Sequence, residues 1–194
     1  IAGLLNREGI DYICIKGPQL SRMIYGREAL KESVDLDIML VNADDLIKVH
    51  SLLALLGDSQ SNLNQYKGRL ARKIFLIAKR EVHYFNRKTR CAIDLHIRPG
   101  ANTYLTANNF RGFFSDLITD DLDGTPVTIL PDEVYFVYLC YHGSLHQFSR
   151  LAWLMDIRAF LIMKGKLFDY KVLLSVARSL QVERCVLLTL LLLK

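Results

Sequence analysis

Residues 34–41, VDLDIMLV, carry the strongest strand signal in the chain. Side chains alternate between the two faces of a strand, so Asp35 and Asp37 point the same way and the apolar residues around them point the other way. Two carboxylates this close repel each other and raise each other's pKa unless a cation lies between them. The stretch therefore predicts a strand that is buried on one face. Its acidic face fits either a solvated sheet edge or a site for a divalent cation.

The residues before this strand predict a helix end, a strand, a glycine turn and a second helix. Residues 1–9, IAGLLNREG, are amphipathic and stop at a glycine, and residues 10–17, IDYICIKG, are rich in β-forming residues. Residues 18–26, PQLSRMIYG, have a helical period and begin with proline, which is favoured at the first helical position. The turn at Lys16 and Gly17 therefore leads into a helix N-terminus, whose N–H groups and dipole can hold a phosphate. An ordinary strand-to-helix turn has the same pattern and is the more common case.

The residues after the strand predict one more helix and two more strands. Asp44 is expected to cap an amphipathic helix over residues 44–57, and the polar stretch over residues 58–68 is expected to be a loop. The strands EVHYF and CAIDLHI follow at residues 81–85 and 91–97, with a turn between them at residues 86–90 and a further turn at Asp123 and Gly124.

A third acid, Asp94, lies in the strand at residues 91–97 and is flanked by apolar residues. If this strand lies next to the one that carries Asp35 and Asp37, the three carboxylates form one cluster. Three acids on one face are the usual protein contribution to a two-metal phosphoryl-transfer site, and Mg²⁺ or Mn²⁺ prefers such oxygen ligands. We therefore take Asp35, Asp37 and Asp94 as candidate metal ligands and catalytic residues. Because clustered acids repel each other without a metal, Asp37→Asn is expected to leave the metal-free protein as stable or more stable.

The composition indicates a globular protein in two parts. Of the 194 residues, 51% are hydrophobic and 23% are charged, which supports a real core and excludes a disordered chain. The pattern changes at residue 130 from mixed strands and helices to an almost wholly helical period. We therefore expect an α/β (α+β) fold in which residues 1–130 form a domain with a small mixed β-sheet and residues 131–194 form a C-terminal helical subdomain.

Charge and cysteine content restrict the partners and the compartment. The net charge of +5 suits a phosphate-bearing ligand but is too small to indicate nucleic acid, although basic clusters near residues 69–80 and 86–90 keep that partner open. The four cysteines form no CxxC pair and three lie in apolar runs, which predicts buried thiols in a reducing compartment. No signal peptide is apparent, and the apolar run VLLTLLLLK is too short to cross a bilayer. These features predict a cytoplasmic protein without a membrane partner.

The order of these features resembles the DNA polymerase β-like nucleotidyltransferase superfamily and, more narrowly, a bacterial family of uncharacterised nucleotidyltransferases. In that family an LKG turn is followed by a tyrosine, a basic residue and a DxDxLV strand, which are matched here by Ile15-Lys16-Gly17, Tyr25, Lys31 and residues 35–41. A later DLH strand is matched by Asp94-Leu95-His96, and a helical stretch with two histidines and an RLxWLxD run is matched by His142, His146 and residues 150–156. The resemblance covers roughly residues 10–160, and the combination is more specific than any of its pieces.

The resemblance implies a metal-dependent enzyme that moves a nucleoside monophosphate from a nucleoside triphosphate, such as ATP, to an acceptor that the sequence does not identify. It implies that Asp35 and Asp37 hold two Mg²⁺ or Mn²⁺ ions and that Asp94 holds the catalytic ion. It also implies that Lys16, Gly17 and Lys31 contact the nucleotide.

Two departures from the family pattern weaken the expected nucleotide contacts. Pro18 stands where the superfamily usually has a serine whose N–H and hydroxyl bind the triphosphate, and proline has neither group. Lys31 stands where the family usually has arginine, and lysine lacks the bidentate guanidinium. These departures keep an alternative open, in which the chain is a catalytically inactive nucleotide-sensing or partner-binding module on the same fold.

The histidines of the helical part allow two interpretations. His142 and His146 are four residues apart and share a helix face, which Arg150 is expected to continue. In the first interpretation this face looks into the cleft, and His142 and Arg150 bind the nucleotide. In the second, these residues join the two parts of the molecule through hydrogen bonds. The tyrosines at positions 135, 138 and 141 are predicted to pack in the core rather than to stack on a base.

Overall fold

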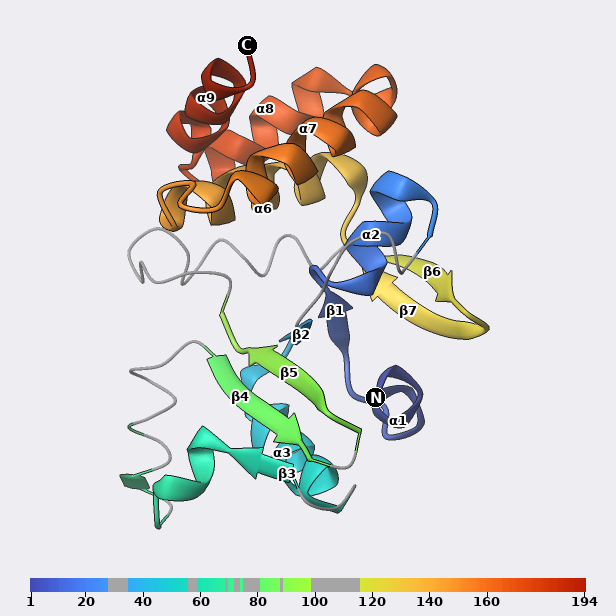
Figure 1. Cartoon of the computed structure of the whole chain (residues 1–194), viewed down its shortest axis with the longest axis vertical. Helices are drawn as coiled ribbons and strands as arrows, with labels where there is room; N and C mark the ends of the chain where they lie inside the picture. Colours follow the sequence, from blue (N-terminus) through green and yellow to red (C-terminus); the bar gives the residue numbers. More distant parts are fainter. Residues whose placement is uncertain are drawn as a thin grey trace.

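The strands that contain Asp35, Asp37 and Asp94 belong to one mixed β-sheet (Figure 1). The computed structural model describes residues 1–27, 35–55, 59–68, 70–71, 74, 81–87, 89–98 and 116–194. Its main sheet contains β1 (Tyr12–Cys14), β2 (Asp35–Leu40), β3 (Ser59–Ser61), β4 (Glu81–Asn86) and β5 (Cys91–His96), in the order β1-β2-β5-β4-β3. β2 and β5 are parallel, and every other neighbouring pair in this sheet is antiparallel. The predicted small mixed sheet is therefore confirmed.

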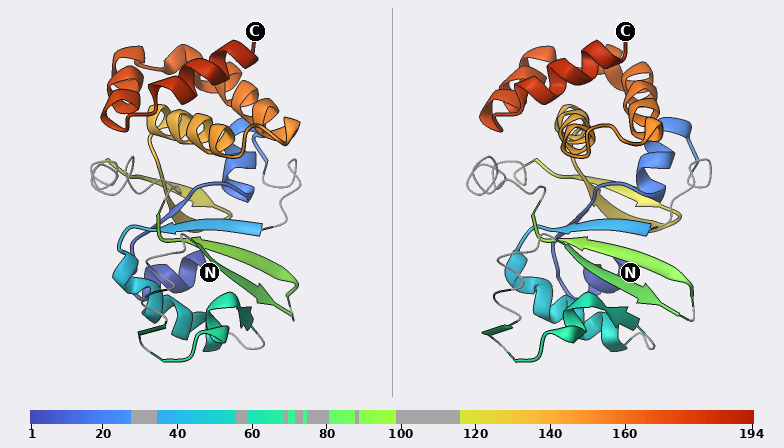
Figure 2. Two further views of the ribbon diagram at one scale, coloured as in Figure 1. Left: turned by 90° about the vertical axis from the view of Figure 1, so that its left-hand side faces the viewer. Right: turned by 60° about the vertical axis from the view of Figure 1, so that its left-hand side comes forward.

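The two faces of the sheet are covered by different helices. Figure 2 shows the sheet between α1 (Ala2–Arg7) and α3 (Leu46–Leu55) on one side and the C-terminal helices on the other. Ile38 and Leu40 belong to the core on the side of α1 and α3. Ile13 and Met39 belong to a second core that continues into the C-terminal helices. The strand alternation read from the sequence therefore separates two apolar layers, one on each face.

The helix after the first strand begins and ends where its sequence predicts. Pro18 occupies the first position of α2 (Pro18–Tyr25), where its missing N–H costs no helical hydrogen bond. Gly26 ends α2 in the left-handed conformation, with φ 74°, which glycine adopts without strain.

Two local predictions in the next segment are wrong. Asn42, rather than Asp44, caps this segment: its side chain accepts the Asp44 N–H, and a 3₁₀ turn, η2 (Ala43–Asp45), precedes α3. The stretch at residues 58–68, expected to be a loop, contains β3 and a second 3₁₀ turn, η3 (Asn62–Gln65). These residues are polar because β3 is an edge strand, so no apolar alternation marked it.

A separate hairpin links the sheet to the helical half. It consists of β6 (Ile118–Leu122) and β7 (Thr125–Ile129), and the predicted turn at Asp123 and Gly124 is confirmed. Both turn residues have positive φ, 50° and 77°, as a two-residue hairpin requires. The Pro126 carbonyl in β7 accepts a hydrogen bond of 2.8 Å from Asn6, which ties the hairpin to α1.

Four helices follow the hairpin: α6 (Asp132–Leu145), α7 (Leu151–Lys164), α8 (Tyr170–Ser179) and α9 (Glu183–Leu192), with a short 3₁₀ turn, η5 (Gly165–Leu167), after α7. Tyr135, Tyr138 and Tyr141 are buried, which confirms their predicted place in the core. The Tyr135 ring stacks on Phe160 of α7 with ring centroids 5.6 Å apart. Among the residues described, no helix is long and apolar enough to cross a membrane.

The helix that carries His142 is shorter than the sequence suggested. α6 ends at Leu145, and Gln147 and Phe148 follow with φ of 53° and 47°. The Phe148 ring folds back onto Gly143 so closely that a Cβ at that position would lie 2.4 Å from it. Arg150 is the N-cap of α7, so the expectation that it continues the face of His142 is wrong.

The cysteines are free thiols, but they are not all buried. Cys14 and Cys140 are buried, and burial raises the pKa of each thiol to about 12. Cys91 is exposed and Cys185 is partly buried. The prediction of buried thiols therefore fails at Cys91, whose side chain lies at the start of β5.

Candidate active site

The three acids lie on one face of two adjacent strands. β2 pairs with β5 in a parallel register that places Asp37 opposite Asp94 and Asp35 opposite Ala92. The prediction that these two strands are neighbours is therefore confirmed. Asp37 is buried, with 4% of its surface exposed, while Asp35 and Asp94 are half-buried. Of the three carboxylates, Asp37 therefore lies inside the protein, whereas Asp35 and Asp94 are partly accessible to solvent.

Two basic side chains, Lys16 and His96, converge on Asp37. Its Oδ1 atom lies 2.8 Å from Lys16 Nζ and 3.0 Å from His96 Nε2. Burial alone would raise the pKa of Asp37, but the hydrogen bond from His96 and the charge of Lys16 outweigh it and hold that pKa well below its usual range. Asp37 is therefore ionised and paired, although the sequence suggested an uncompensated carboxylate.

Asp94 is held by a histidine from the neighbouring strand. β4 pairs with β5 so that His83 lies opposite Asp94, and His83 Nδ1 is 2.5 Å from Asp94 Oδ1. The other ring nitrogen of His83 lies 3.4 Å from Glu81 Oε1. Burial lowers the pKa of His83, but the hydrogen bond and charge of Asp94 outweigh it and raise that pKa.

Asp35 is in a different electrostatic position from Asp37. Burial, followed by the charges of Asp37 and Asp94, raises the pKa of Asp35. The nearby Lys16 opposes this effect without cancelling it. Burial and the repulsion expected between the acids therefore both act on Asp35.

The glycine turn brings Lys16 to the acids. Gly17 caps α2 with φ 73° and ψ −143°, a conformation that is accessible almost only to glycine. The Ile15 N–H donates to the Asp37 carbonyl over 3.2 Å, which continues the β1–β2 pairing up to the turn. From the other side, the buried Tyr135 hydroxyl of α6 donates to the Ile15 carbonyl over 2.5 Å. The turn is therefore fixed by both the sheet and the helical half.

The helical half approaches the same turn through His142. A small cavity beside Lys16 is also lined by His142, Trp153 and Asp156. Burial, followed by the charge of Lys16, lowers the pKa of His142 to about 3, so its imidazole is neutral. Its buried Nε2 atom has no hydrogen-bond partner within the described part of the chain.

Arg150 and His146 are more exposed than His142. The Arg150 guanidinium carbon lies 5.7 Å from the centre of the Trp153 ring, and His142 packs edge-on against the same ring with centroids 5.3 Å apart. The structure thus brings Arg150 and His142 to one tryptophan, although they lie on different helices. Lys31, the remaining candidate for nucleotide binding, lies outside the described residues.

Among the described residues, no group of three histidine, cysteine or acidic side chains is arranged as a formed metal site. The donor set nevertheless fits a hard divalent cation, because three carboxylates share one sheet face and such ions take oxygen ligands. Lys16 now supplies positive charge at the Asp37 oxygen that such an ion would need, and the His96 ring contacts the same oxygen. Metal binding at this oxygen would therefore require Lys16 to move.

The histidine partners of the acids were not predicted from the sequence. His96 entered only as part of a family motif, and His83 and Glu81 were given no role. The alternation in EVHYF does place Glu81, His83 and Phe85 on one face, but only the strand register shows that this is the acidic face. Register depends on the turn and on packing, which the segment alone does not specify.

Comparison with known proteins connects this geometry to a family. The sequence model of a family described as "Uncharacterised nucleotidyltransferase" matches residues 1–194. The chain belongs to this family. The nucleotidyltransferase resemblance seen in the sequence is thereby confirmed over a longer span than the motifs covered. No curated protein sequence matches the chain.

Solved structures of nucleotidyltransferases share the fold. The solution structure of the antibiotic-resistance factor ANT(2'')-Ia is 12% identical, with a TM-score of 0.57 over 91% of this chain and 86% of that one. The crystal structure of ANT(2'')-Ia in complex with adenylyl-2''-tobramycin is 10% identical, with a TM-score of 0.57 over 92% and 91%. An antigenic nucleotidyltransferase-like protein from Paracoccidioides brasiliensis is 13% identical, with a TM-score of 0.50 over 93% and 88%. Family and fold together support nucleotide transfer as the general function of this nucleotidyltransferase.

Proposed function

We propose that this nucleotidyltransferase moves a nucleoside monophosphate from a nucleoside triphosphate to a hydroxyl-bearing acceptor, with release of pyrophosphate. The observation that carries the proposal is the register of β2 and β5, which gathers Asp35, Asp37 and Asp94 on one face beside the Lys16–Gly17 turn. Carboxyl groups that share one face next to the lysine of a glycine turn suit a triphosphate bound together with divalent ions.

In this proposal Asp35 and Asp37 would hold two Mg²⁺ or Mn²⁺ ions, and Asp94 would hold the catalytic ion. When bound, these ions would lower the pKa of the attacking hydroxyl and neutralise charge on the triphosphate. His83 orients Asp94 through their hydrogen bond. His96 plays the same part for Asp37.

The residues around the turn would bind the triphosphate. Lys16 would leave Asp37 and place its ammonium group on phosphate oxygens, while the backbone at Gly17 approaches them without a side chain in the way. Pro18 supplies no N–H, so Lys16 carries more of this contact than a serine-containing turn would need.

His142 and Arg150 are proposed to contact the nucleotide from the helical side. Because the pKa of His142 is lowered to about 3, it would act as a neutral hydrogen-bonding group rather than as a cation. Its buried Nε2, without a partner among the described residues, is the atom that a bound ligand could satisfy. Arg150 is exposed beside Trp153 and would supply the positive charge.

The acceptor is proposed to be a small molecule rather than nucleic acid. The fold neighbour solved with adenylyl-2''-tobramycin binds a nucleotidylated small molecule, which supports an acceptor of that size. The net charge of +5 gives no strong reason to invoke a polyanionic acceptor.

The direct test is to incubate the purified chain with each labelled nucleoside triphosphate and Mg²⁺ or Mn²⁺. Pyrophosphate release is measured, and the protein and an added metabolite pool are then examined by mass spectrometry. We expect metal-dependent pyrophosphate release and one nucleotidylated product. Asp37→Asn should abolish both, and the exposed Asp44→Asn serves as the matched control. Absence of pyrophosphate release and of any nucleotide-bearing product with all four triphosphates would refute the proposal.

A further inference from the structure

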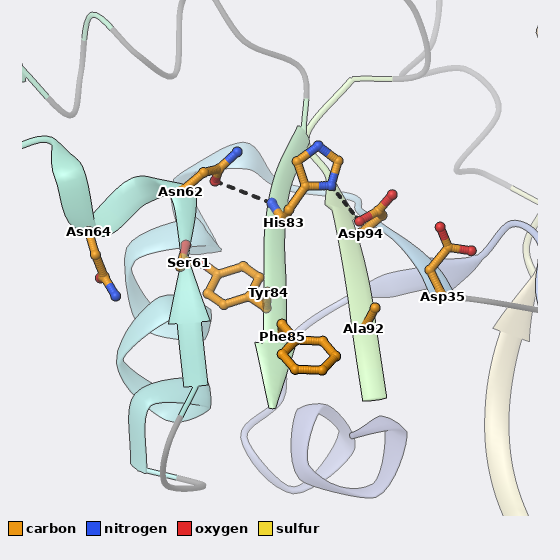
Figure 3. A pocket seen from close by; sticks show the side chains of 9 residues that line it. All are labelled: Asp35, Ser61, Asn62, Asn64, His83, Tyr84, Phe85, Ala92 and Asp94. Carbon is orange, nitrogen blue, oxygen red and sulfur yellow. Dashed lines mark hydrogen bonds and ion pairs between the residues drawn. The ribbon is translucent and has the colours of Figure 1, made fainter. Parts of the chain in front are cut away.

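A second, larger cavity opens on the other side of the acids from the Lys16–Gly17 turn. It has a volume of about 640 Å³, within the usual range of small-molecule sites. Figure 3 shows it running from Asp35 and Asp94 across β4 towards Asn62 and Asn64 of η3. One end of the cavity therefore lies at the proposed reaction centre and the other at the edge of the sheet.

The strand register places a small side chain, between two larger ones, on the sheet surface that forms the floor of this cavity. Phe85 of β4, Ala92 of β5 and Asp35 of β2 form one row across three strands, because each is the register partner of the next. Ala92 carries the smallest side chain of the row, so the floor is lowest between the ring and the carboxylate. Phe85 is 42% exposed, and Figure 3 shows its ring beside Ala92 at the cavity. An exposed ring next to a small residue offers a flat apolar surface to a ligand.

The far wall carries uncharged polar groups. Ser61, Asn62 and Asn64 line it, and the Asn62 side chain accepts the His83 N–H over 3.3 Å, which fixes this asparagine against β4. Amide and hydroxyl groups of this kind can both donate and accept hydrogen bonds, as a hydroxyl group also can.

The charges in the cavity disfavour an anionic ligand. Two of its lining residues, Asp35 and Asp94, are carboxylates, and no lysine or arginine is among its described lining residues. His83 is the lining group that can carry positive charge, and its ring is already paired with Asp94. A phosphate or carboxylate on the ligand would therefore meet the two carboxylates at one end, or the bound triphosphate once metal ions neutralise them, and no lysine or arginine among the described residues at the other.

We infer that this cavity binds the acceptor, and that the acceptor is a hydroxyl-rich small molecule of sugar type that is neutral or amine-bearing and lacks a phosphate or carboxylate. The inference rests on the proposed function. A sugar ring would lie over Ala92 against Phe85, with its hydroxyls on Asn62 and Asn64. One hydroxyl at the other end then attacks the α-phosphorus. The new bond joins that oxygen to phosphorus, the bond to the bridging oxygen breaks with its electron pair leaving on pyrophosphate, and the hydroxyl proton passes to water.

The test compares three matched probes: methyl α-D-glucopyranoside, its 2-amino-2-deoxy form and its 6-phosphate. Binding is measured by saturation-transfer NMR with Mg²⁺ and a non-hydrolysable triphosphate, so that no turnover is needed. We expect signals for the first two probes and none for the 6-phosphate. Ala92→Val adds two methyl groups to the floor of the cavity and should weaken neutral-sugar binding on the order of tenfold. The thermal shift produced by Mg²⁺ and triphosphate should persist in this variant.

Charge reversal at the rim provides a second, independent readout. Asn64→Lys should create binding of the 6-phosphate, whereas Gln65→Lys adds the same charge at the next position of η3, which does not line the cavity, and should not. The inference is overturned if the 6-phosphate binds the wild-type chain at least as well as the neutral sugar. It is also overturned if no probe binds, or if the two lysine variants behave alike.

The two proposals can fail separately. Sugar binding that responds to Ala92→Val, in a chain that releases no pyrophosphate, would keep the cavity assignment and remove the transferase function. Nucleotide transfer to a phosphorylated or nucleic-acid acceptor would do the reverse.

Discussion

Asp35 and Asp37 are chemically identical and two residues apart, yet the structure gives them opposite electrostatic surroundings. Asp37 is paired with Lys16 and His96, and its pKa is depressed. The pKa of Asp35 is raised, first by burial and then by its acidic neighbours. The sequence treats the pair as equivalent, because nothing in VDLDIMLV indicates which carboxylate the turn lysine reaches.

This difference predicts opposite effects of two matched substitutions. Asp37→Asn should destabilise the metal-free protein by roughly 3 kcal/mol, because it breaks a buried ion pair. This reverses the sequence-based expectation for that variant. Asp35→Asn should leave the metal-free protein as stable or slightly more stable, because it removes repulsion. Both variants should lose the rise in melting temperature that Mg²⁺ and a triphosphate produce in the wild type. Equal effects of the two substitutions on unliganded stability would contradict the assignment.

The lowered pKa of His142 predicts that the free energy of unfolding depends on pH. Its folded pKa is lowered to about 3, while an unfolded histidine titrates near 6.5. Between these values the unfolded chain binds the extra proton, so this contribution to stability is fully present above about pH 6.5. It is lost progressively as the pH falls towards 3. Denaturant melts from pH 7 to 5 should show this loss in the wild type. His142→Gln should reduce the slope by at most about 1.4 kcal/mol per pH unit. An unchanged slope in the variant would mean that His142 is already protonated or is accessible to water.

Segment types were more predictable than segment boundaries and contacts. β2, β5 and α2 follow from alternation, a proline start and a glycine stop, which are local signals. The end of α6 is not local, because it depends on Phe148 folding over Gly143, and no proline or glycine marks the break. The edge strand β3 was also missed, because its pairing with β4 comes from distant residues.

The hydrogen bond from Tyr135 of α6 allows a test of how the helical half positions the Lys16–Gly17 turn. Tyr135→Phe removes the hydroxyl that satisfies the buried Ile15 carbonyl, which should cost about 1–3 kcal/mol. Because Lys16 follows Ile15 directly, the thermal shift with Mg²⁺ and triphosphate should shrink as well. Tyr170→Phe is the matched control, because Tyr170 is 57% exposed and the hydrogen bond from its hydroxyl to the Gly165 carbonyl is only partly buried, so its loss should cost less. The assignment fails if thermal melts show the same loss for both variants.

The two halves of the chain differ in secondary structure, yet they share a core. The change at residue 130 separates the strands from the C-terminal helices, but one apolar cluster joins Ile13 and Met39 of the sheet to Tyr135 and Phe160 of the helices. The other cluster lies across the sheet, around Ile38 and α3. The proposed nucleotide contacts also come from both halves, Lys16 from one and His142 from the other. We therefore propose that the boundary between residues 130 and 131 does not separate independently folding units.

Coupling between the halves can be measured with the single tryptophan. Trp153 lies in α7 and reports the helical half by fluorescence, while far-UV circular dichroism reports the whole chain. Ile38 is fully buried on the side of the sheet that faces α1 and α3, in the core to which the C-terminal helices do not contribute. Ile38→Ala should therefore destabilise the chain by about 2–5 kcal/mol and lower the Trp153 transition and the circular-dichroism transition by the same amount. Leu55→Ala, at a position that is 83% exposed on α3, should move neither. If the Trp153 transition stays in place while circular dichroism resolves two steps, the helical half folds on its own. The small cavity between Lys16 and His142 would then lie between two separable units.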